Sequence, residues 1–375
     1  MTRRDLFKFA LTTCGTAACA QDLGLAGVLN SAPAADSSRV LGSLREVAAS
    51  RGIFFGSMVL KKTLATVPKY SDLVAHQCGI IVPGDELKWV SLRPTPDQFD
   101  FAEGDWIEQF ASSHGMKFRG HTLVWEAALP KWFVSTVNLD NAKRVLLSHI
   151  HTVVGHYAGQ VHSWDVVNEG IQIEDGRPDG LKVTPWLLYI GPEYIDLAFH
   201  AAHEADPKAI LVYNENDLEP ENNATEHKRR AVLALLTRLV KKGVPIHGLG
   251  IQAHVYAETD VAGPGFRRFL QDVENLGLTI LVTELDVRDR DLPGDIAVRD
   301  AQVAKQYYHF LSSTLQFKSV KTVLTWGLSD RFTCLSKRRP REDGLPVRPL
   351  LYDAELQPKP AFAAVWRAFN EAPKR

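Results

Sequence analysis

The chain has 375 residues, of which 45% are hydrophobic and 23% charged, and its formal net charge is −1 at pH 7. These values are typical of a globular protein with a sizeable core, and the near-neutral charge gives no indication of a nucleic-acid partner. The sequence contains no apolar stretch of the roughly 18 residues that are needed to span a bilayer. We therefore expect no membrane partner for the mature protein.

The first 35 residues differ from the rest of the chain. Residues 2–8 (Thr-Arg-Arg-Asp-Leu-Phe-Lys) resemble a twin-arginine export signal, and a stretch rich in Ala and Thr follows them. We predict a signal peptide over residues 1–35, cut at 32–34 or 18–20, and a periplasmic or secreted mature protein. A basic N-terminus of a cytoplasmic protein is the alternative. Because no Pro/Ser/Gly-rich linker follows, we predict a single domain over residues 38–371.

Eight short segments rich in Val, Ile and Leu alternate with segments of helical spacing. The predicted strands are residues 53–59, 79–84, 118–124, 162–168, 209–214, 248–254, 279–285 and 322–328. The predicted helices include residues 103–114, 141–158, 193–205, 226–242, 265–276 and 300–316. This alternation predicts an α/β fold in which a parallel sheet closes into a (β/α)8 TIM barrel.

Polar and aromatic residues stand at the carboxyl ends of most predicted strands, where catalytic side chains of such barrels lie. They are Asp85, His121, Trp125, Glu169, Asn214, His254, Glu284 and Trp326. Either glutamate alone would be interpreted as a surface charge. Two glutamates that end apolar strands of one barrel predict glycoside hydrolysis, which needs one carboxyl group to protonate the leaving oxygen and another to attack or to activate water.

Residues next to the two glutamates extend this hypothesis. Asn168 offers an amide that could hold a sugar 2-hydroxyl. Asp286 lies on the same side of its strand as Glu284, where it could orient a histidine or pair with a cation. His254 follows Gln252 at the spacing that turns both to one face, and it could keep the nucleophile charged, although a lone histidine there is more often a packed core residue.

Other features of the sequence are less specific. Trp125 and Trp326 could stack on the flat apolar faces of sugars. We expect no metal or cofactor, because no His or Cys group has ligand spacing and no phosphate-binding glycine loop is present. The basic run over residues 337–341 (Lys-Arg-Arg-Pro-Arg) is expected to be a solvated loop; the alternative is a contact with acidic decorations on a sugar polymer.

Several segments in order resemble glycoside hydrolase family 10, the (β/α)8 endo-β-1,4-xylanases. The resemblance covers residues 52–370 and is strongest over 119–125, 164–169, 248–254, 283–286, 326–327 and 349–362. It implies that Glu169 is the acid/base and Glu284 the nucleophile of a retaining double displacement, with Asp286 in support. We expect the substrate to contact a further set of side chains: Asp85, Lys88, His121, Trp125, Asn168, Gln252, His254 and Trp326.

The chain departs from the family pattern at four places. Gly84 and Asp85 stand where the family has Glu-Asn, residues 126–130 read Glu-Ala-Ala-Leu-Pro instead of His-Ser-Gln-Leu-Pro, residues 214–217 read Asn-Glu-Asn-Asp instead of Asn-Asp-Tyr-Asn, and Cys334 replaces a Trp. The resemblance places most of these positions in the second glycone subsite. Losing a bidentate contact and losing a stacking Trp could each cost about 1–3 kcal/mol of substrate binding. This predicts weak activity on long xylan or a preference for another or shorter glycone.

The sequence thus predicts an exported, monomeric, retaining β-glycosidase, most readily an endo-1,4-β-xylanase that acts on xylan or xylo-oligosaccharides. One alternative is a hydrolase or transglycosidase of another β-linked or decorated glycan. Another is a carbohydrate-binding barrel without turnover, which the presence of both glutamates with Asn168 and His254 disfavours. Retention requires the two carboxyl groups to be about 5–5.5 Å apart.

Overall fold

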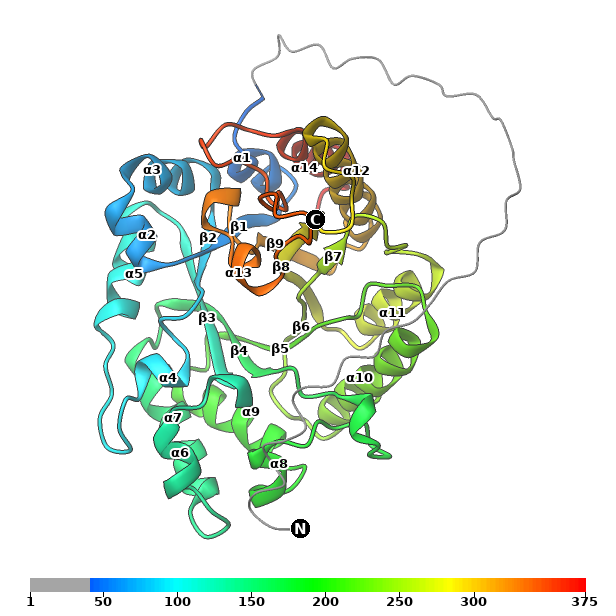
Figure 1. The fold of residues 1–375 in the computed structure, drawn as a ribbon. Helices are drawn as coiled ribbons and strands as arrows, with labels where there is room; N and C mark the ends of the chain where they lie inside the picture. The colour runs from blue at the N-terminus through cyan, green and yellow to red at the C-terminus, as the bar shows by residue number, and fades with distance from the viewer. Residues whose placement is uncertain (1–40) are drawn as a thin grey trace. The chain divides into compact units, whose positions relative to one another are not determined.

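The computed structural model describes residues 41–375, and eight parallel strands form a closed ring at its centre (Figure 1). The ring consists of β1 (Phe54–Val59), β2 (Ile80–Pro83), β3 (Lys117–Val124), β4 (Val161–Asn168), β5 (Ile210–Glu215), β6 (Gly248–Ile251), β8 (Thr279–Arg288) and β9 (Val320–Thr325). Neighbouring strands pair in chain order, and β6 pairs with β8 to close the ring. The predicted (β/α)8 barrel is confirmed. The predicted signal peptide, residues 1–35, lies outside the described residues.

Helices surround the ring on its outer side (Figure 1). The six predicted helices are present as α5 (Ala102–Ser113), α7 (Ala142–His156), α9 (Tyr194–Ala205), α10 (Asn223–Lys241), α11 (Pro264–Asn275) and α12 (Ile296–Thr314). The others are α1 (Leu44–Ala49), α2 (Lys61–Thr66), α3 (Pro68–Gln77), α4 (Trp89–Leu92), α6 (Lys131–Thr136), α8 (Pro185–Ile190), α13 (Leu335–Arg338) and α14 (Pro360–Glu371).

Helix α11 shows why these segments fold as they do. Pro264 occupies its first turn, where a missing backbone N–H costs nothing. Phe266, Phe269, Leu270 and Val273 follow at spacings of three and four, so they share one face, and that face is buried. The same pattern in the other long helices covers the apolar outer side of the strands and forms the core between the two layers.

Three strands differ from the prediction. The predicted eighth strand, residues 322–328, is β9 at Val320–Thr325, so Trp326 follows the strand. The predicted sixth strand is interrupted at Ala253, whose φ is 62°, and its end forms a separate short strand, β7 (His254–Tyr256). Strand β8 does not end just after Glu284, as predicted, but continues to Arg288. The reason is that β7 pairs with Asp286–Arg288 and supplies backbone partners beyond the ring. Glu284 therefore lies inside β8, between the residues that pair with β6 and the residues that pair with β7.

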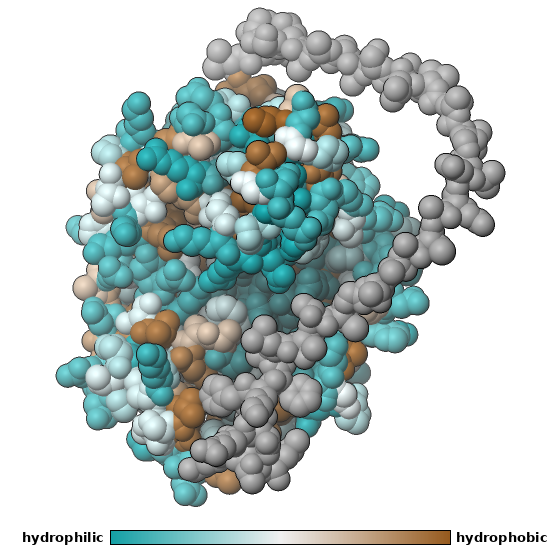
Figure 2. Space-filling model, in the orientation of Figure 1, coloured by the Kyte–Doolittle hydropathy of each residue, from teal (hydrophilic) through white to brown (hydrophobic). Residues whose placement is uncertain are grey.

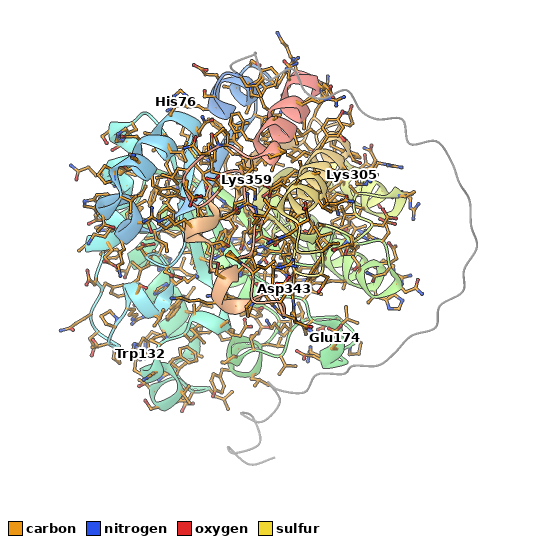
Figure 3. The ribbon with its side chains drawn as sticks, turned by 45° about the horizontal axis from the view of Figure 1, so that its top comes forward. His76, Trp132, Glu174, Lys305, Asp343 and Lys359 are labelled. Atoms are coloured by element: carbon orange, nitrogen blue, oxygen red, sulfur yellow. The ribbon has the colours of Figure 1, made fainter. Side chains whose placement is uncertain are left out.

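The β9–α14 segment, residues 326–359, carries α13 beside the carboxyl ends of the strands (Figure 1). Near its start, Asp330 accepts a hydrogen bond from Lys359 Nζ at 2.8 Å. In its middle, Arg341 Nη2 donates to the carbonyl of Leu292 at 2.7 Å, and Nη1 donates to the carbonyl of Asp289. Asp343 and Lys359 both lie toward the middle of this face in Figure 3. Lys359 thus joins the two ends of the segment, while Arg341 and the ion pair of Arg348 with Asp300 of α12 tie it to the barrel.

The helices of residues 41–375 include none with the length and apolarity that crossing a bilayer requires. In the same part of the chain, no three His, Cys, Asp or Glu side chains converge in a way that could hold a metal ion. One face of the molecule is hollowed, and hydrophilic residues surround that hollow (Figure 2).

Candidate active site

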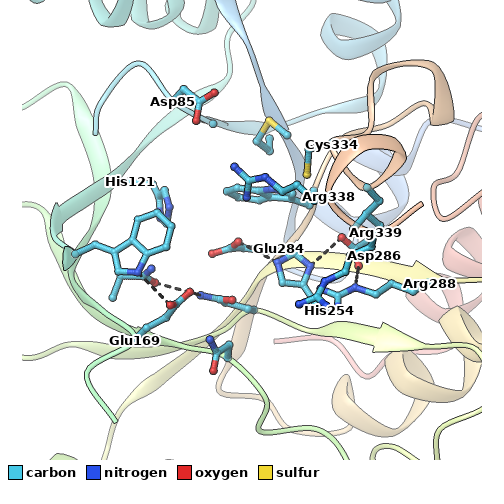
Figure 4. Close-up of a pocket in the computed structure, with 18 of the residues that line it drawn as sticks. Asp85, His121, Glu169, His254, Glu284, Asp286, Arg288, Cys334, Arg338 and Arg339 are labelled. Carbon is cyan, nitrogen blue, oxygen red and sulfur yellow. Dashed lines mark hydrogen bonds and ion pairs between the residues drawn. The ribbon is translucent and has the colours of Figure 1, made fainter. Parts of the chain in front are cut away.

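A cleft of about 520 Å³ opens at the carboxyl ends of the strands. This volume lies in the range of small-molecule binding sites. Every residue that the sequence predicted for the site lines the cleft (Figure 4): Asp85, Lys88, His121, Trp125, Asn168, Glu169, Gln252, His254, Glu284, Asp286 and Trp326. The barrel brings them together because the carboxyl ends of parallel strands meet at one end of the ring.

Glu284 lies at the bottom of the cleft and is only 5% exposed. Its Oε1 accepts a hydrogen bond from Asn214 Nδ2 at 2.9 Å, and its Oε2 lies 3.3 Å from His254 Nε2. Burial raises the pKa of Glu284, but the His254 hydrogen bond and the His121 imidazole lower it more, and the pKa lies below its ordinary value. Glu284 is therefore held as a carboxylate.

His254 joins Glu284 to Asp286. Its Nδ1 lies 2.8 Å from Asp286 Oδ2, while Nε2 faces Glu284. Burial lowers the pKa of His254, but the two carboxylates outweigh it and raise the pKa well above its ordinary value. The imidazole is therefore protonated and donates from both nitrogens. The other Asp286 oxygen lies 3.6 Å from Arg288 Nε, so both contacts considered for Asp286, with a histidine and with a cation, are present.

Glu169 lies in a more open environment. It follows the last residue of β4 with a φ of 53°, and its side chain is 18% exposed. Trp125 Nε1 donates to Oε2 and Gln252 Nε2 donates to Oε1, both at 3.0 Å. Trp125, predicted as a stacking platform, is therefore also a hydrogen-bond donor to this carboxyl group. The two donors fix the orientation of Glu169 while the side chain still reaches the cleft.

A lysine that the sequence analysis did not identify approaches Glu169. Lys182 Nζ lies 3.8 Å from Glu169 Oε2 and 2.5 Å from Glu126 Oε1. Glu126 is one of the departures from the family pattern, and its partner lies in the loop after β4. Periodicity gives no signal for such a pair, because loop residues have no fixed relation to the strand ends.

Three amide side chains connect the surroundings of the two glutamates. Asn168 Oδ1 accepts from Asn214 Nδ2 at 2.8 Å and from Gln252 Nε2 at 3.3 Å. Thr283 Oγ1 in turn donates to Asn214 Oδ1 at 2.7 Å. A Cβ at position 250 would lie 2.2 Å from Asn214 Oδ1, so Gly250 provides the space that this amide needs. The predicted role of Asn168 toward a sugar hydroxyl stays a prediction.

The upper wall of the cleft contains several predicted binding residues. Lys88 Nζ lies 2.8 Å from Asp85 Oδ1 and 5.4 Å from the centroid of the Trp125 ring. His121 Nδ1 lies 2.9 Å from Asp165 Oδ2, which fixes its ring. The Trp326 ring packs edge-on against His121, with centroids 5.6 Å apart. These contacts hold cationic and aromatic groups toward the space above Glu284.

Three of the four departures from the family pattern contribute residues to the cleft lining: Gly84 and Asp85, Asn216 and Asp217, and Cys334. A Cβ at position 84 would lie 2.7 Å from Met58 Sδ, so Met58 occupies the space beside Gly84. Cys334 and Asp217 line the cleft without a hydrogen bond from either side chain among the described residues. Arg288, Arg338 and Arg339 also line it and were not among the predicted site residues.

Comparison with known proteins agrees with this geometry. Residues 43–368 match the family described as Glycosyl hydrolase family 10. The Beta-1,4-xylanase of Dictyoglomus thermophilum is 37% identical over 309 residues, which span 78% of this chain and 82% of that protein. Native xylanase 10B of Thermotoga maritima superposes with a TM-score of 0.80 at 32% identity, covering 88% of this chain and 98% of the other.

Xylanase 10B of Thermotoga petrophila RKU-1, whose structure is described as a complex with xylobiose, gives a TM-score of 0.80 at 31% identity, covering 88% of this chain and 97% of that one. The matched residues, 43–368, include all the strands of the barrel that carries the cleft. The chain belongs to glycosyl hydrolase family 10.

Proposed function

We propose that this glycoside hydrolase is an endo-1,4-β-xylanase that cleaves xylan or xylo-oligosaccharides with retention of configuration. One observation carries the proposal: a buried, ionised Glu284, held by Asn214 and His254, shares a cleft with the more open Glu169. Two carboxyl groups in different environments are what acid-assisted displacement at a sugar carbon requires. The printed names of the matched relatives, which are xylanases, support the choice of substrate.

In the first step, Glu169 transfers its proton to the glycosidic oxygen while the C–O bond to the leaving sugar breaks. Glu284 attacks the anomeric carbon with a carboxylate oxygen and forms a glycosyl ester. Trp125 and Gln252 hold Glu169 in the orientation for this transfer. His254 and Asn214 keep Glu284 ionised and aimed from below.

In the second step, the ionised Glu169 accepts a proton from water as the water oxygen attacks the anomeric carbon. The ester bond breaks and Glu284 leaves as a carboxylate, so two inversions give net retention. The same contacts from His254 and Asn214 stabilise this leaving carboxylate. The separation of about 5–5.5 Å between the carboxyl groups that retention requires stays a prediction.

The test uses Glu284→Gln and Glu169→Gln, with Glu103→Gln as a control on the exposed surface of α5. We expect each cleft variant to lose at least about a thousandfold in kcat on xylohexaose, because each removes a group that exchanges bonds or protons. Chromatography of the products and NMR of the first-formed anomer check the bond cleaved and the β configuration.

Inverted product would contradict the double displacement. Cleavage of another β-linked glycan, with no xylohexaose turnover, would replace the substrate. Full activity of the Glu284→Gln variant would remove Glu284 from the chemistry. Export of the mature chain by the residue 2–8 motif and a monomeric state are proposed together with this function. They rest on the sequence alone.

A further inference from the structure

Arg338 and Arg339 line the cleft without an acidic partner. Arg338 is the last residue of α13 and Arg339 directly follows it, and both are exposed. Among residues 41–375, neither guanidinium forms an ion pair within 4.0 Å or donates a hydrogen bond. The other cations on the cleft wall are paired: Lys88 with Asp85 at 2.8 Å and Arg288 with Asp286 at 3.6 Å.

Other arginines in or near the β9–α14 segment, unlike Arg338 and Arg339, have acidic partners. Each of the following forms an ion pair with an acidic side chain: Arg290 with Glu342, Arg299 with Asp289, Arg341 with Asp343, and Arg348 with Asp300. Arg331, Arg338 and Arg339 form no ion pair among residues 41–375. Of these three, only Arg338 and Arg339 line the cleft.

The position of these two arginines relative to the glutamates indicates which part of a substrate they face. All of these residues line one cleft, and Figure 4 shows Arg338 and Arg339 on one side of Glu284 and Glu169 on the other side of it. Under the proposed function, Glu169 protonates the oxygen of the leaving sugar. The two arginines then lie toward the glycone, which is the part of the substrate that Glu284 attacks.

The backbone under the two arginines is held in place. Leu335, in the first turn of α13, is 5% exposed and packs inward. Arg341 then ties the following residues to the carbonyls of Asp289 and Leu292. Arg339 also borders a small hollow next to the cleft, which it shares with Arg288 and Tyr256. The arginines are thus long side chains on a fixed support.

Arg338 and Arg339 are consecutive residues of like charge, and an anion bound at this wall of the cleft lowers the repulsion between them. The planar guanidinium fork matches a carboxylate with two parallel hydrogen bonds, whereas a neutral sugar hydroxyl gains less from the positive charge. Cys334, one turn before Arg338, has a short side chain and leaves room beside the arginine.

We infer that Arg338 and Arg339 form a binding site for the carboxylate of an acidic sugar substituent, a uronic acid, on the glycone side of the cleft. The inference rests on the proposed function for the direction of the substrate. Of the two interpretations of the basic run over residues 337–341, it selects contact with acidic decorations for these two residues.

The experiment compares two ligands that differ at a single carbon, which carries a carboxylate in one and an alcohol in the other. One is a xylo-oligosaccharide with a single glucuronic acid branch, and the other is the same molecule after reduction of its carboxyl group to an alcohol. Binding is measured by calorimetry in a Glu284→Gln background, so that no turnover is needed. We expect the acidic ligand to bind about tenfold more tightly, and this preference to shrink at high salt.

Arg338→Gln/Arg339→Gln, added to the same background, should bring the ratio of the two affinities to about one. Lys337→Gln, on the same helix but outside the cleft lining, should leave the ratio unchanged. Equal binding of both ligands before substitution, or an equal loss of preference in the Lys337→Gln control, would overturn the inference. Because binding is read without catalysis, failed hydrolysis of xylohexaose would count against the proposed function alone.

Discussion

The floor and the rim of the cleft are built in different ways. The floor consists of Asn214, His254, Glu284 and Asp286, which come from β5, β7 and β8 and bond to one another or to a shared neighbour. The rim consists of Cys334, Arg338 and Arg339, which come from the β9–α14 segment and have no acidic partner among the described residues. The difference indicates that the strands carry the chemistry, while the loop selects what reaches it.

The largest effect in the floor is expected for Asn214→Ala. This change removes the hydrogen bonds to Glu284 and Asn168 and leaves Thr283 without its acceptor. Hydrogen bonds to charged groups contribute about 1.5–3 kcal/mol, so kcat/KM should fall on the order of a hundredfold on xylohexaose. Steady-state kinetics measure the change, with Asn275→Ala on α11 as the control. An unchanged kcat/KM would show that the reaction does not depend on the hydrogen bond from Asn214 to Glu284.

A smaller and more specific effect is expected for Asp286→Asn. Without this carboxylate the pKa of His254 falls, the imidazole loses its proton at a lower pH, and the pKa of Glu284 rises toward its ordinary value. The acid limb of kcat/KM should therefore move to higher pH, with about a tenfold loss at neutral pH. Arg288→Gln removes the contact with the other Asp286 oxygen and the hydrogen bond to Tyr256 but leaves the Asp286 carboxylate facing His254, so it should shift the acid limb less. If the wild type, Asp286→Asn and Arg288→Gln all gave the same acid limb, the charge of His254 would not control the protonation of Glu284.

The smallest effect is expected for Lys182→Met, beside Glu169. The variant removes a cation 3.8 Å from Glu169 and leaves the carboxylate of Glu126 without its partner. The unpaired charge of Glu126 then lies near the acid/base, so kcat/KM on xylohexaose should fall only a few-fold. Lys182→Met/Glu126→Gln also removes the negative charge and should lose less activity. A larger loss in the double variant than in Lys182→Met would refute this account.

Much of the floor could be predicted from the sequence. The period of strands and helices indicated the barrel, and polar residues at strand ends indicated the cleft, because parallel strands meet at their carboxyl ends. Alternation along β8 also placed Asp286 on the side of Glu284, and His254 Nδ1 lies 2.8 Å from Asp286. These predictions succeeded because the backbone ladder fixes where such side chains point.

Other features of the site could not be predicted, because they depend on tertiary contacts that the spacing of residues in the sequence does not indicate. The extension of β8 to Arg288 requires β7, which exists only because the backbone turns at Ala253. The position of Asn214 behind Glu284 requires the space that Gly250 leaves. The pair of Lys182 and Glu126 joins two loops, and the exposure of Arg338 depends on how its segment folds.

The attachment of the β9–α14 segment makes it a natural unit for exchange between related proteins. Lys359 holds Asp330 at its start, and Arg341 binds the carbonyls of Asp289 and Leu292 in its middle. A library that varies residues 334–339 while keeping those anchors would change the glycone side of the cleft and leave the strand ladder untouched. Variants of this enzyme with new substrate ranges could therefore be sought in six positions, without redesign of the barrel.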